Sequence, residues 1–294
     1  MRRTQLAARS VRLLGIPLLV SGLASLTAPV ALVQAAQVRP VGPASLIHDV
    51  LKAVAASSPG NAWAAGGYAT ESGADKTLTL RWNGTSWVRT PSVSPGIHSV
   101  LNGVATTSAT SAWAVGGTGG SNAATLIEQW NGKAWKRVPS PSTVSNGTGL
   151  SGVVALSTGS AWAVGCSECG LGGYAESLIE RWNGKTWKQL AVPSRAGNGD
   201  LFAVASVSTR SAWAAGGYYA VSGESFSVKT VTERWNGNAW KRVSSPSPGA
   251  EASVYGLDAL STNNAWAVGA YQTVSGSGGS DKTLILHWNG KAWK

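Results

Sequence analysis

The chain has 294 residues, of which 43% are hydrophobic and 13% are charged, and its formal net charge is +11 at pH 7. This length and apolar content exclude an intrinsically disordered chain and fit one repeat-built domain of about 250 residues. The basic balance is compatible with an acidic polymer as partner.

The first residues have the composition of an export signal. Arginines at positions 2, 3, 9 and 12 precede an apolar run from Leu13 to Val33, which ends at the small-residue site Val33-Gln34-Ala35. We therefore predict a signal peptide over residues 1–35, cleavage after Ala35 and a secreted protein. The alternative is an uncleaved membrane anchor, because the run approaches the length that spans a bilayer.

Five repeats of about 50 residues follow and fill the chain from residue 47 to residue 294. Each repeat has a first apolar strand, a short turn, a strand with the sequence AWAVGG or a close variant, a long loop, a strand ending in WNG, and a last strand such as KAWKRVPSP. Four strands per unit without a helical period predict an all-β fold, a β-propeller of four-stranded blades. The predicted blades begin near residues 47, 97, 149, 200 and 252.

The fifteen tryptophans occupy three positions in every repeat. One lies in the AWAVGG strand, and two flank the Asn-Gly pair of the WNGxxW hairpin, where we expect Asn-Gly to supply the positive backbone angles of a tight turn. We expect these rings to pack between neighbouring blades, because burying each one is worth roughly 2 to 3 kcal/mol. A carbohydrate-stacking role for the repeated positions is the alternative.

The last strand of each repeat collects positive charge. Half of the basic residues after position 35 lie there: Arg89, Lys133, Lys136, Arg137, Lys185, Lys188, Lys241, Arg242, Lys291 and Lys294. Lysines on an outermost strand protect an open sheet edge from association. The alternative is attraction to phosphate- or carboxylate-rich polymers. We expect no nucleic acid partner, because the chain lacks a groove in which basic and aromatic residues alternate.

The two cysteines, Cys166 and Cys169, stand in the run GCSECG. In an oxidising compartment the pair predicts a local disulfide. A zinc site needs a second ligand pair at suitable spacing, and the sequence shows none.

The order of a hydrophobic strand, Gly-Gly, a variable loop and a paired aromatic before the final-strand Trp resembles the kelch repeat, as in AWAVGGTGGSNAATLIEQWNGKAW. The resemblance covers the chain from about residue 47 to its end and implies a β-propeller with interaction surfaces in its loops. This chain has Trp-Asn-Gly where kelch repeats have a segment with Tyr and Asp. No catalytic residues carry over.

Antiparallel succession places the long loops and the connections between blades at one end of every blade, the loop face. Variable loops on a rigid scaffold are common binding sites. Two sets of equivalent positions on this face supply the candidate ligand-binding residues: His48, His98, Asp200 and Glu251 near the channel, and Tyr68, Tyr218 and Tyr271 farther along. The first set could hold a metal or a polar ligand, but a lone loop histidine is more often solvated, so we expect no metal and no cofactor.

The regular scaffold shows no convergent acid, base and nucleophile, so we expect a non-enzymatic secreted propeller. Its predicted partner is a protein or a cell-surface polysaccharide, bound through the loop face. A lectin-like propeller with one sugar site per blade is the first alternative. A hydrolase or lyase that acts on polysaccharide through Asp200 or Glu251 is the second.

The number of blades depends on the chain's first segment after the signal. Residues 36–46 could pair beside the last strand of the fifth repeat and close a five-bladed ring, which is the arrangement we expect. The alternative is that the chain is a fragment of a longer propeller.

Overall fold

The computed structural model describes residues 48–119, 123–141, 147–169, 175–193, 199–222, 225–274 and 279–294. The predicted signal peptide and the segment 36–46 lie outside these residues. Every regular element in the described ranges is a β-strand, so no helix there could cross a membrane.

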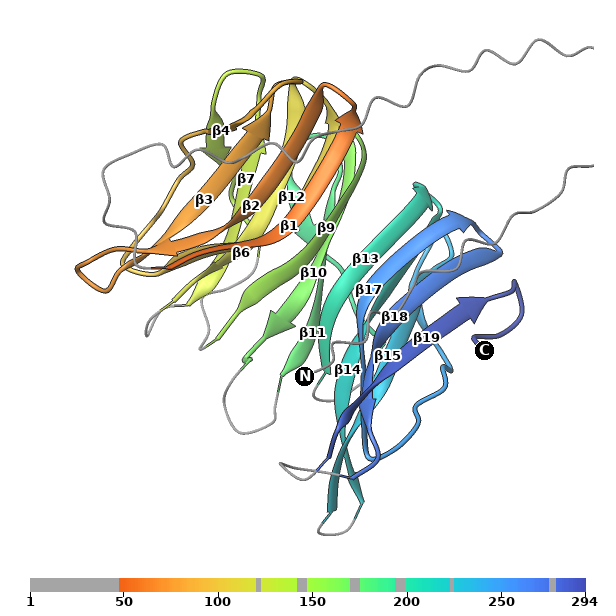
Figure 1. Ribbon diagram of the computed structural model, residues 1–294. Coiled ribbons are helices and arrows are strands. Elements are labelled where there is room, and N and C mark those ends of the chain that lie inside the picture. The colour runs from red at the N-terminus through yellow and green to blue at the C-terminus, as the bar shows by residue number, and fades with distance from the viewer. Residues whose placement is uncertain are drawn as a thin grey trace, which may run out of the picture. The chain divides into compact units, whose positions relative to one another are not determined.

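The strands of each repeat pair in antiparallel order, and we call the five units blades 1 to 5 (Figure 1). Blades 1 to 3 are separate four-stranded sheets, whereas blades 4 and 5 are joined by one parallel pairing into a seven-stranded sheet. Blade 1 contains β1 (His48–Ser58), β2 (Asn61–Ala69), β3 (Asp75–Trp82) and β4 (Trp87–Arg89). Blade 2 contains β5 (Ser99–Ser108), β6 (Ser111–Thr118), β7 (Ala124–Trp130) and β8 (Trp135–Arg137). Blade 3 contains β9 (Gly149–Ser157), β10 (Ser160–Ser167), β11 (Glu176–Trp182) and β12 (Trp187–Gln189).

Blade 4 contains β13 (Gly199–Ser208), β14 (Ser211–Ser222), β15 (Ser225–Trp235) and β16 (Trp240–Val243). Blade 5 contains β17 (Glu251–Ser261), β18 (Asn264–Gln272) and β19 (Asp281–Trp288), and a single bridge between Trp288 and Trp293 stands in place of its fourth strand. The prediction of an all-β fold is confirmed for the described residues, and blades 1 to 4 have the predicted four strands.

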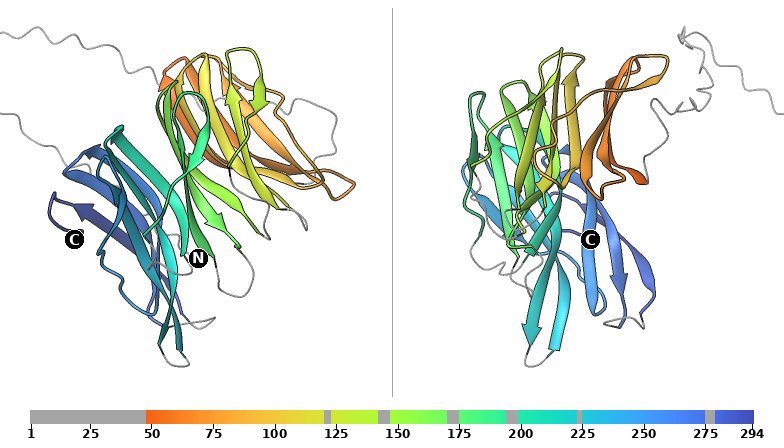
Figure 2. Two further views of the ribbon diagram at one scale, coloured as in Figure 1. Left: turned by 180° about the vertical axis from the view of Figure 1, so that it is seen from behind. Right: turned by 90° about the vertical axis from the view of Figure 1, so that its left-hand side faces the viewer.

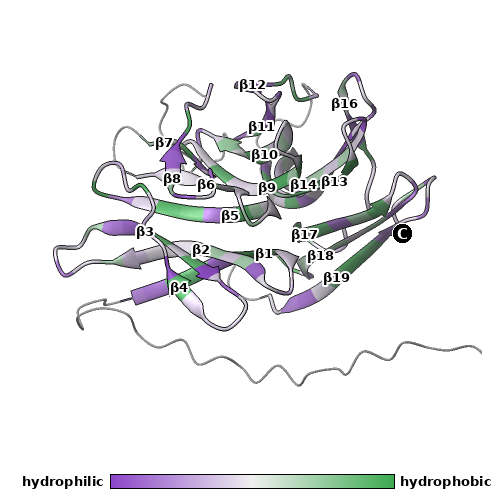
Figure 3. Ribbon diagram, turned by 90° about the horizontal axis from the view of Figure 1, so that it is seen from above, coloured by the Kyte–Doolittle hydropathy of each residue, from purple (hydrophilic) through white to green (hydrophobic). Residues whose placement is uncertain are grey.

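The fourth strand is the outer edge of its sheet in blades 1 to 4, as the charge pattern predicts. The lysines of these strands are exposed, and Figure 3 shows the hydrophilic character of β8. Their position fits protection of an open edge.

The first glycine of each AWAVGG strand lies against a bulge in the first strand of the same blade. A Cβ atom on Gly116 would fall within 1.9 Å of the Val100 carbonyl oxygen, and Gly66, Gly165, Gly216 and Gly269 meet the equivalent carbonyls. Register shifts in the β5–β6 pairing, such as that between Leu101 and Gly103, mark the bulge. Only glycine fits this close approach.

The WNGxxW hairpin differs from the predicted turn. Within the hairpin of blade 3, Gly184 has a positive φ, of 93°, and Asn183 does not. The Asn183 side-chain oxygen accepts hydrogen bonds from the backbone N–H groups of Lys185 and Thr186 at 2.9 Å. The loop is therefore closed by an Asn side chain and a single left-handed glycine. The prediction that both Asn and Gly take positive angles is wrong.

Twelve of the fifteen tryptophans pack between consecutive blades, as predicted; the exceptions are Trp82, Trp87 and Trp266. The ring of Trp113 in β6 lies 4.9 Å from that of Trp182 and 5.0 Å from that of Trp187, which both belong to blade 3. The same group recurs around Trp63, Trp162 and Trp213. Four hydrophobic clusters result, each shared by two consecutive blades, and the turned views of Figure 2 show the stacked sheets.

Among the described residues, no neighbouring blade covers the outer faces of blades 1 and 5. Trp266 of blade 5 is 45% exposed, whereas its four equivalents are at most 1% exposed. The other four tryptophans contact a hairpin of the next blade. Trp266 instead has the His287 ring stacked on it, with the ring centroids 4.3 Å apart. The contact that would close a five-bladed ring, Trp266 against the blade 1 hairpin, is not formed among the described residues, so these sheets do not fix the number of blades.

Candidate functional site

A small pocket lies between blades 4 and 5 at the loop face. Its volume is about 180 Å³. The residues that line it come from β13, β14, β15, β17, β18 and β19, and include Asp200, Phe202, Tyr219, Glu251, Tyr255, Tyr271, Gln272 and Asp281. Three of the predicted ligand-binding residues, Asp200, Glu251 and Tyr271, therefore meet in one pocket.

Backbone contacts between the two blades place these side chains. A single parallel pairing, between Val228 of β15 and Glu251, joins blade 4 to blade 5 at this end. Gly217 of β14 allows the close approach, because a Cβ atom there would lie 2.4 Å from the Ser253 hydroxyl oxygen. The pocket is therefore formed by residues of paired β-strands and not by loops alone.

Aromatic side chains form one part of the pocket wall. The rings of Phe202 and Tyr255 lie 5.6 Å apart at an angle of 45°. Tyr255 is 59% exposed and Tyr219 is 45% exposed. Exposed rings on a rigid scaffold offer flat apolar surface together with a hydroxyl group.

Carboxylates form the polar part of the wall. Burial raises the pKa of Asp200 above its usual range. Its Oδ1 atom is buried and has no hydrogen-bond partner among the described residues. Asp281 accepts a hydrogen bond from the Gln272 side-chain amide at 2.8 Å. An acidic, aromatic pocket therefore lies within a chain of net charge +11.

The other predicted site residues have different neighbours. His98 Nδ1 lies 2.9 Å from an Asp75 carboxylate oxygen, between blades 1 and 2, and His48 is exposed at the start of β1. Among the described residues, the ligand atoms of His48, His98, Asp200 and Glu251 do not gather into a group that could hold a metal ion.

Tyr68 and Tyr218 are covered by arginines of their own blades. The Arg89 guanidinium lies 4.3 Å above the Tyr68 ring, and that of Arg242 lies 4.0 Å above the Tyr218 ring. These cation–π contacts give both tyrosines a packing role. Only Tyr271 of the three lines the pocket.

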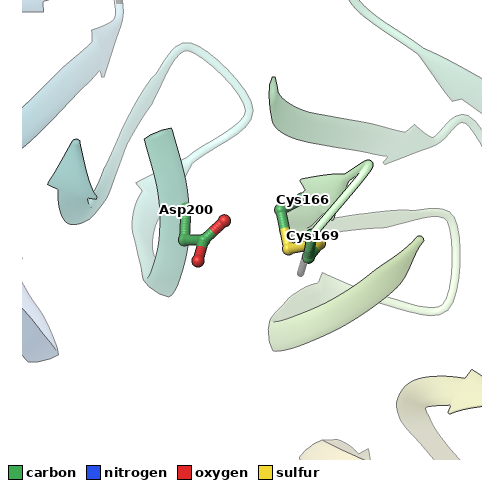
Figure 4. A group of neighbouring side chains, drawn as sticks. All are labelled: Cys166, Cys169 and Asp200. Atoms are coloured by element: carbon green, nitrogen blue, oxygen red, sulfur yellow. A yellow bond between two sulfur atoms is a disulfide. The ribbon is translucent and has the colours of Figure 1, made fainter. Parts of the chain in front are cut away.

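Cys166 and Cys169 form a disulfide, as the sequence predicts. The carboxylate of Asp200, from the next blade, lies beside it (Figure 4). Sequence spacing does not predict this neighbour, because it depends on the packing of blade 4 against blade 3.

Four residues of the pocket are not marked by the repeat pattern used above: Phe202, Tyr255, Tyr219 and Asp281. Phe202 and Tyr255 occupy the same position in their repeats, eleven residues before the AWAVGG tryptophan, where the other repeats have Lys52, Asn102 and Ser151. A comparison of that position across the repeats would have found the aromatic pair.

A second pocket, of about 360 Å³, lies on the uncovered face of blade 1. Its lining is mostly apolar and includes Leu51, Val54, Leu80 and Trp87. This is the kind of surface that the other blades bury against a neighbour, so we take the loop-face pocket as the candidate functional site.

No family model matches the chain, and no curated protein matches it either. The likeness to kelch repeats therefore stays a resemblance. Solved structures do match. The chain is 12% identical to a fucose-recognising lectin from Aleuria aurantia with a six-bladed β-propeller fold, with a TM-score of 0.52, covering 85% of this chain and 78% of the lectin.

Two further structures illustrate the range of similar proteins. A polysaccharide lyase of family PL25, an ulvan lyase, is 12% identical, with a TM-score of 0.51 over 81% of this chain and 67% of the lyase. YCF48 bound to D1 peptide is 14% identical, with a TM-score of 0.47 over 85% of this chain, which spans only 66% of that propeller. The chain has the β-propeller fold, which by itself does not assign a function.

Proposed function

We propose that the chain is an exported binding protein, and that the pocket between blades 4 and 5 holds one unit of a cell-surface polysaccharide. The observation that carries the proposal is the meeting of the Phe202–Tyr255 pair with Asp200, Glu251 and Asp281 in one pocket. Aromatic faces pack against the C–H faces of a sugar, and carboxylates accept hydrogen bonds from its hydroxyl groups.

The size of the pocket supports part of a polymer as its ligand. Its volume of about 180 Å³ is smaller than the roughly 300–1,000 Å³ of pockets that enclose drug-sized ligands. A single sugar unit would enter it, and the rest of the polysaccharide would lie across the exposed rings of Tyr219 and Tyr255. The fucose-recognising lectin shows that a similar fold supports sugar recognition.

A glycan array followed by calorimetric titration tests this proposal. Tyr255→Ala and Asp200→Asn should each weaken binding of the best glycan at least about tenfold, a loss of about 1.4 kcal/mol. Tyr68→Ala is the matched control, because Tyr68 is a tyrosine of the loop face outside the pocket, and it should bind as the wild type does. Equal affinity in all variants would contradict the assignment of the pocket. If no glycan binds while a protein partner does, the polysaccharide assignment is wrong.

Catalysis on polysaccharide is the second candidate function. Asp200, whose pKa is raised by burial, lies in the same pocket as Glu251, and two carboxyl groups with different environments are what acid–base cleavage of a glycosidic bond needs. The best glycan should therefore also be incubated with the protein and analysed for shorter products. Cleavage that disappears in both Asp200→Asn and Glu251→Gln would replace binding with turnover as the function.

A further inference from the structure

The disulfide and the nearest carboxylate form a compact group of three side chains from two blades. Cys166 lies next to the end of β10, Cys169 stands in the turn that follows, and Asp200 lies at the start of β13. The two Sγ atoms and a carboxylate oxygen of Asp200 all lie within 4.8 Å of one another. Figure 4 shows the carboxylate facing the sulfur atoms.

We propose that, once this disulfide is reduced, Cys166, Cys169 and Asp200 form a site for a zinc ion. The inference goes beyond the proposed binding function and departs from the sequence expectation of no metal. That expectation rested on the lack of a second ligand pair. The structure instead supplies a third ligand from the neighbouring blade.

The donor set suits zinc. Zn²⁺ prefers thiolate, imidazole and carboxylate ligands in tetrahedral geometry, and three protein ligands leave the fourth position to water. Two thiolates beside one carboxylate also exclude the hard cations Mg²⁺ and Ca²⁺, which prefer oxygen ligands alone. Zn²⁺ would offset two of the three negative charges that reduction and ionisation bring together.

The protein surroundings hold the three ligands in place. Asp200 Oδ1 is buried and has no hydrogen-bond partner among the described residues, so a cation would satisfy it. The Cys169 backbone N–H donates a hydrogen bond to the Gly147 carbonyl at 3.0 Å. A Cβ on Gly147 would fall within 1.8 Å of the Cys169 carbonyl oxygen, so the turn that contains Cys169 packs directly against the backbone at Gly147. The turn would keep its place when the sulfur–sulfur bond breaks.

The chemical step is a two-electron reduction by a phosphine or a dithiol. A phosphine attacks one sulfur, the sulfur–sulfur bond breaks, and water converts the phosphine to its oxide while two protons restore the two thiols. Zinc then displaces two protons from the thiols as it binds. A dithiol would supply the same two electrons and leave as a cyclic disulfide.

A zinc titration of the reduced and oxidised protein tests the site. The chain is reduced with a phosphine, freed of reagent without oxygen, and titrated with Zn²⁺ against a chromogenic chelator. The reduced chain should bind about one Zn²⁺, and the oxidised chain none. Cobalt(II) in place of zinc should give the thiolate charge-transfer absorption of a site with sulfur ligands. Binding far below one equivalent would overturn the proposal, as would reduction that unfolds the chain and shifts its tryptophan emission.

Three variants separate the site from other zinc-binding groups. Asp200→Asn should weaken zinc binding at least about tenfold, since even residues that only orient a ligand cost 10–100-fold. Glu251→Gln, a carboxylate of the same loop face outside the group, should bind zinc as the wild type does. Unchanged affinity in Asp200→Asn would remove this carboxylate from the site and overturn the proposal.

The Cys166→Ser, Cys169→Ser double variant distinguishes this proposal from the proposed function. It should lose zinc binding and keep glycan binding, because neither cysteine lines the pocket. Retained zinc binding in this variant would show that the metal lies elsewhere and contradict the proposal, whatever the glycan result.

Discussion

Three glutamates on equivalent strands are fully buried. Glu128, Glu180 and Glu233 each have 0% exposure. Glu128 accepts a hydrogen bond from the Val93 backbone N–H at 3.0 Å, and Glu180 accepts one from the Ser140 hydroxyl at 2.7 Å. Val93 and Ser140 belong to the connections that leave the preceding blades, so both carboxyls fasten a connection to the next blade.

Burial of these carboxyls makes stability depend on pH. Desolvation raises the pKa of Glu128 and of Glu233 from 4.5 to about 7. The folded chain therefore holds these protons between pH 4.5 and 7, while the unfolded chain releases them. We expect stability to fall as pH rises across this window, by on the order of 3 kcal/mol for each group, and to level off above pH 7.

Urea unfolding at pH 5 and pH 8 measures this effect. The Glu128→Gln, Glu233→Gln double variant should show a smaller difference between the two pH values than the wild type and should be the more stable protein at pH 8. Glu176→Gln, which replaces an exposed glutamate of β11, is the control and should leave the difference unchanged. A wild-type midpoint that rises between pH 5 and pH 8 would contradict the expectation.

At the scale of secondary structure elements, the WNGxxW hairpin fixes the end of each blade opposite the loop face. Its first tryptophan donates an indole N–H hydrogen bond to the turn between the first two strands, as from Trp182 to the Thr158 carbonyl at 3.0 Å. The hairpin and that turn therefore lie at the same end of the blade, as the sequence predicts. This hydrogen bond recurs in every blade.

A glycine-to-alanine pair tests the backbone requirement of the hairpin. Gly184 has a φ of 93°, so Gly184→Ala should destabilise the protein by about 1 to 2 kcal/mol. Gly159, in the adjacent turn, has an ordinary φ and only one atom, at 3.9 Å, near its missing Cβ, so Gly159→Ala should stay within about 0.5 kcal/mol. Denaturant midpoints measure the stability of both variants. Equal losses of stability would show that steric contact, and not the positive φ of Gly184, causes the destabilisation.

Strand order, blade limits and tryptophan packing can be predicted from the sequence because the same pattern of residues recurs in five repeats. The site does not follow in the same way. Asp200 and Glu251 are 51 positions apart, and the pairing of Val228 with Glu251 that brings their blades together has no sequence signal. The sequence also does not predict the arginines that cover Tyr68 and Tyr218, because the charge of the fourth strand indicates edge protection or attraction to acidic polymers and not contact with a ring.

For the whole molecule, tryptophans at equivalent positions of the repeats should contribute unequally to the free energy of unfolding. Trp213 is 1% exposed and lies between Trp288 and Trp293, whereas Trp266 is 45% exposed. Trp213→Ala should therefore cost about 3 to 5 kcal/mol, and Trp266→Ala only about 1 to 2 kcal/mol. Denaturant unfolding measures both losses. A cost for Trp266→Ala that matches Trp213→Ala would show that blade 5 is covered in solution.

Because each hydrophobic cluster is shared by two consecutive blades, an inner blade contributes to two clusters and an end blade to one. Opening of an end blade breaks one cluster, whereas opening of blade 3 breaks two, so local unfolding should begin at the ends. Amide protons of β2 and β18 should then exchange with deuterium faster than those of β10. The loop-face pocket is lined by residues of blades 4 and 5. A ligand bound there should slow amide exchange in blade 5 first. Ligand binding would then stabilise blade 5 against local unfolding.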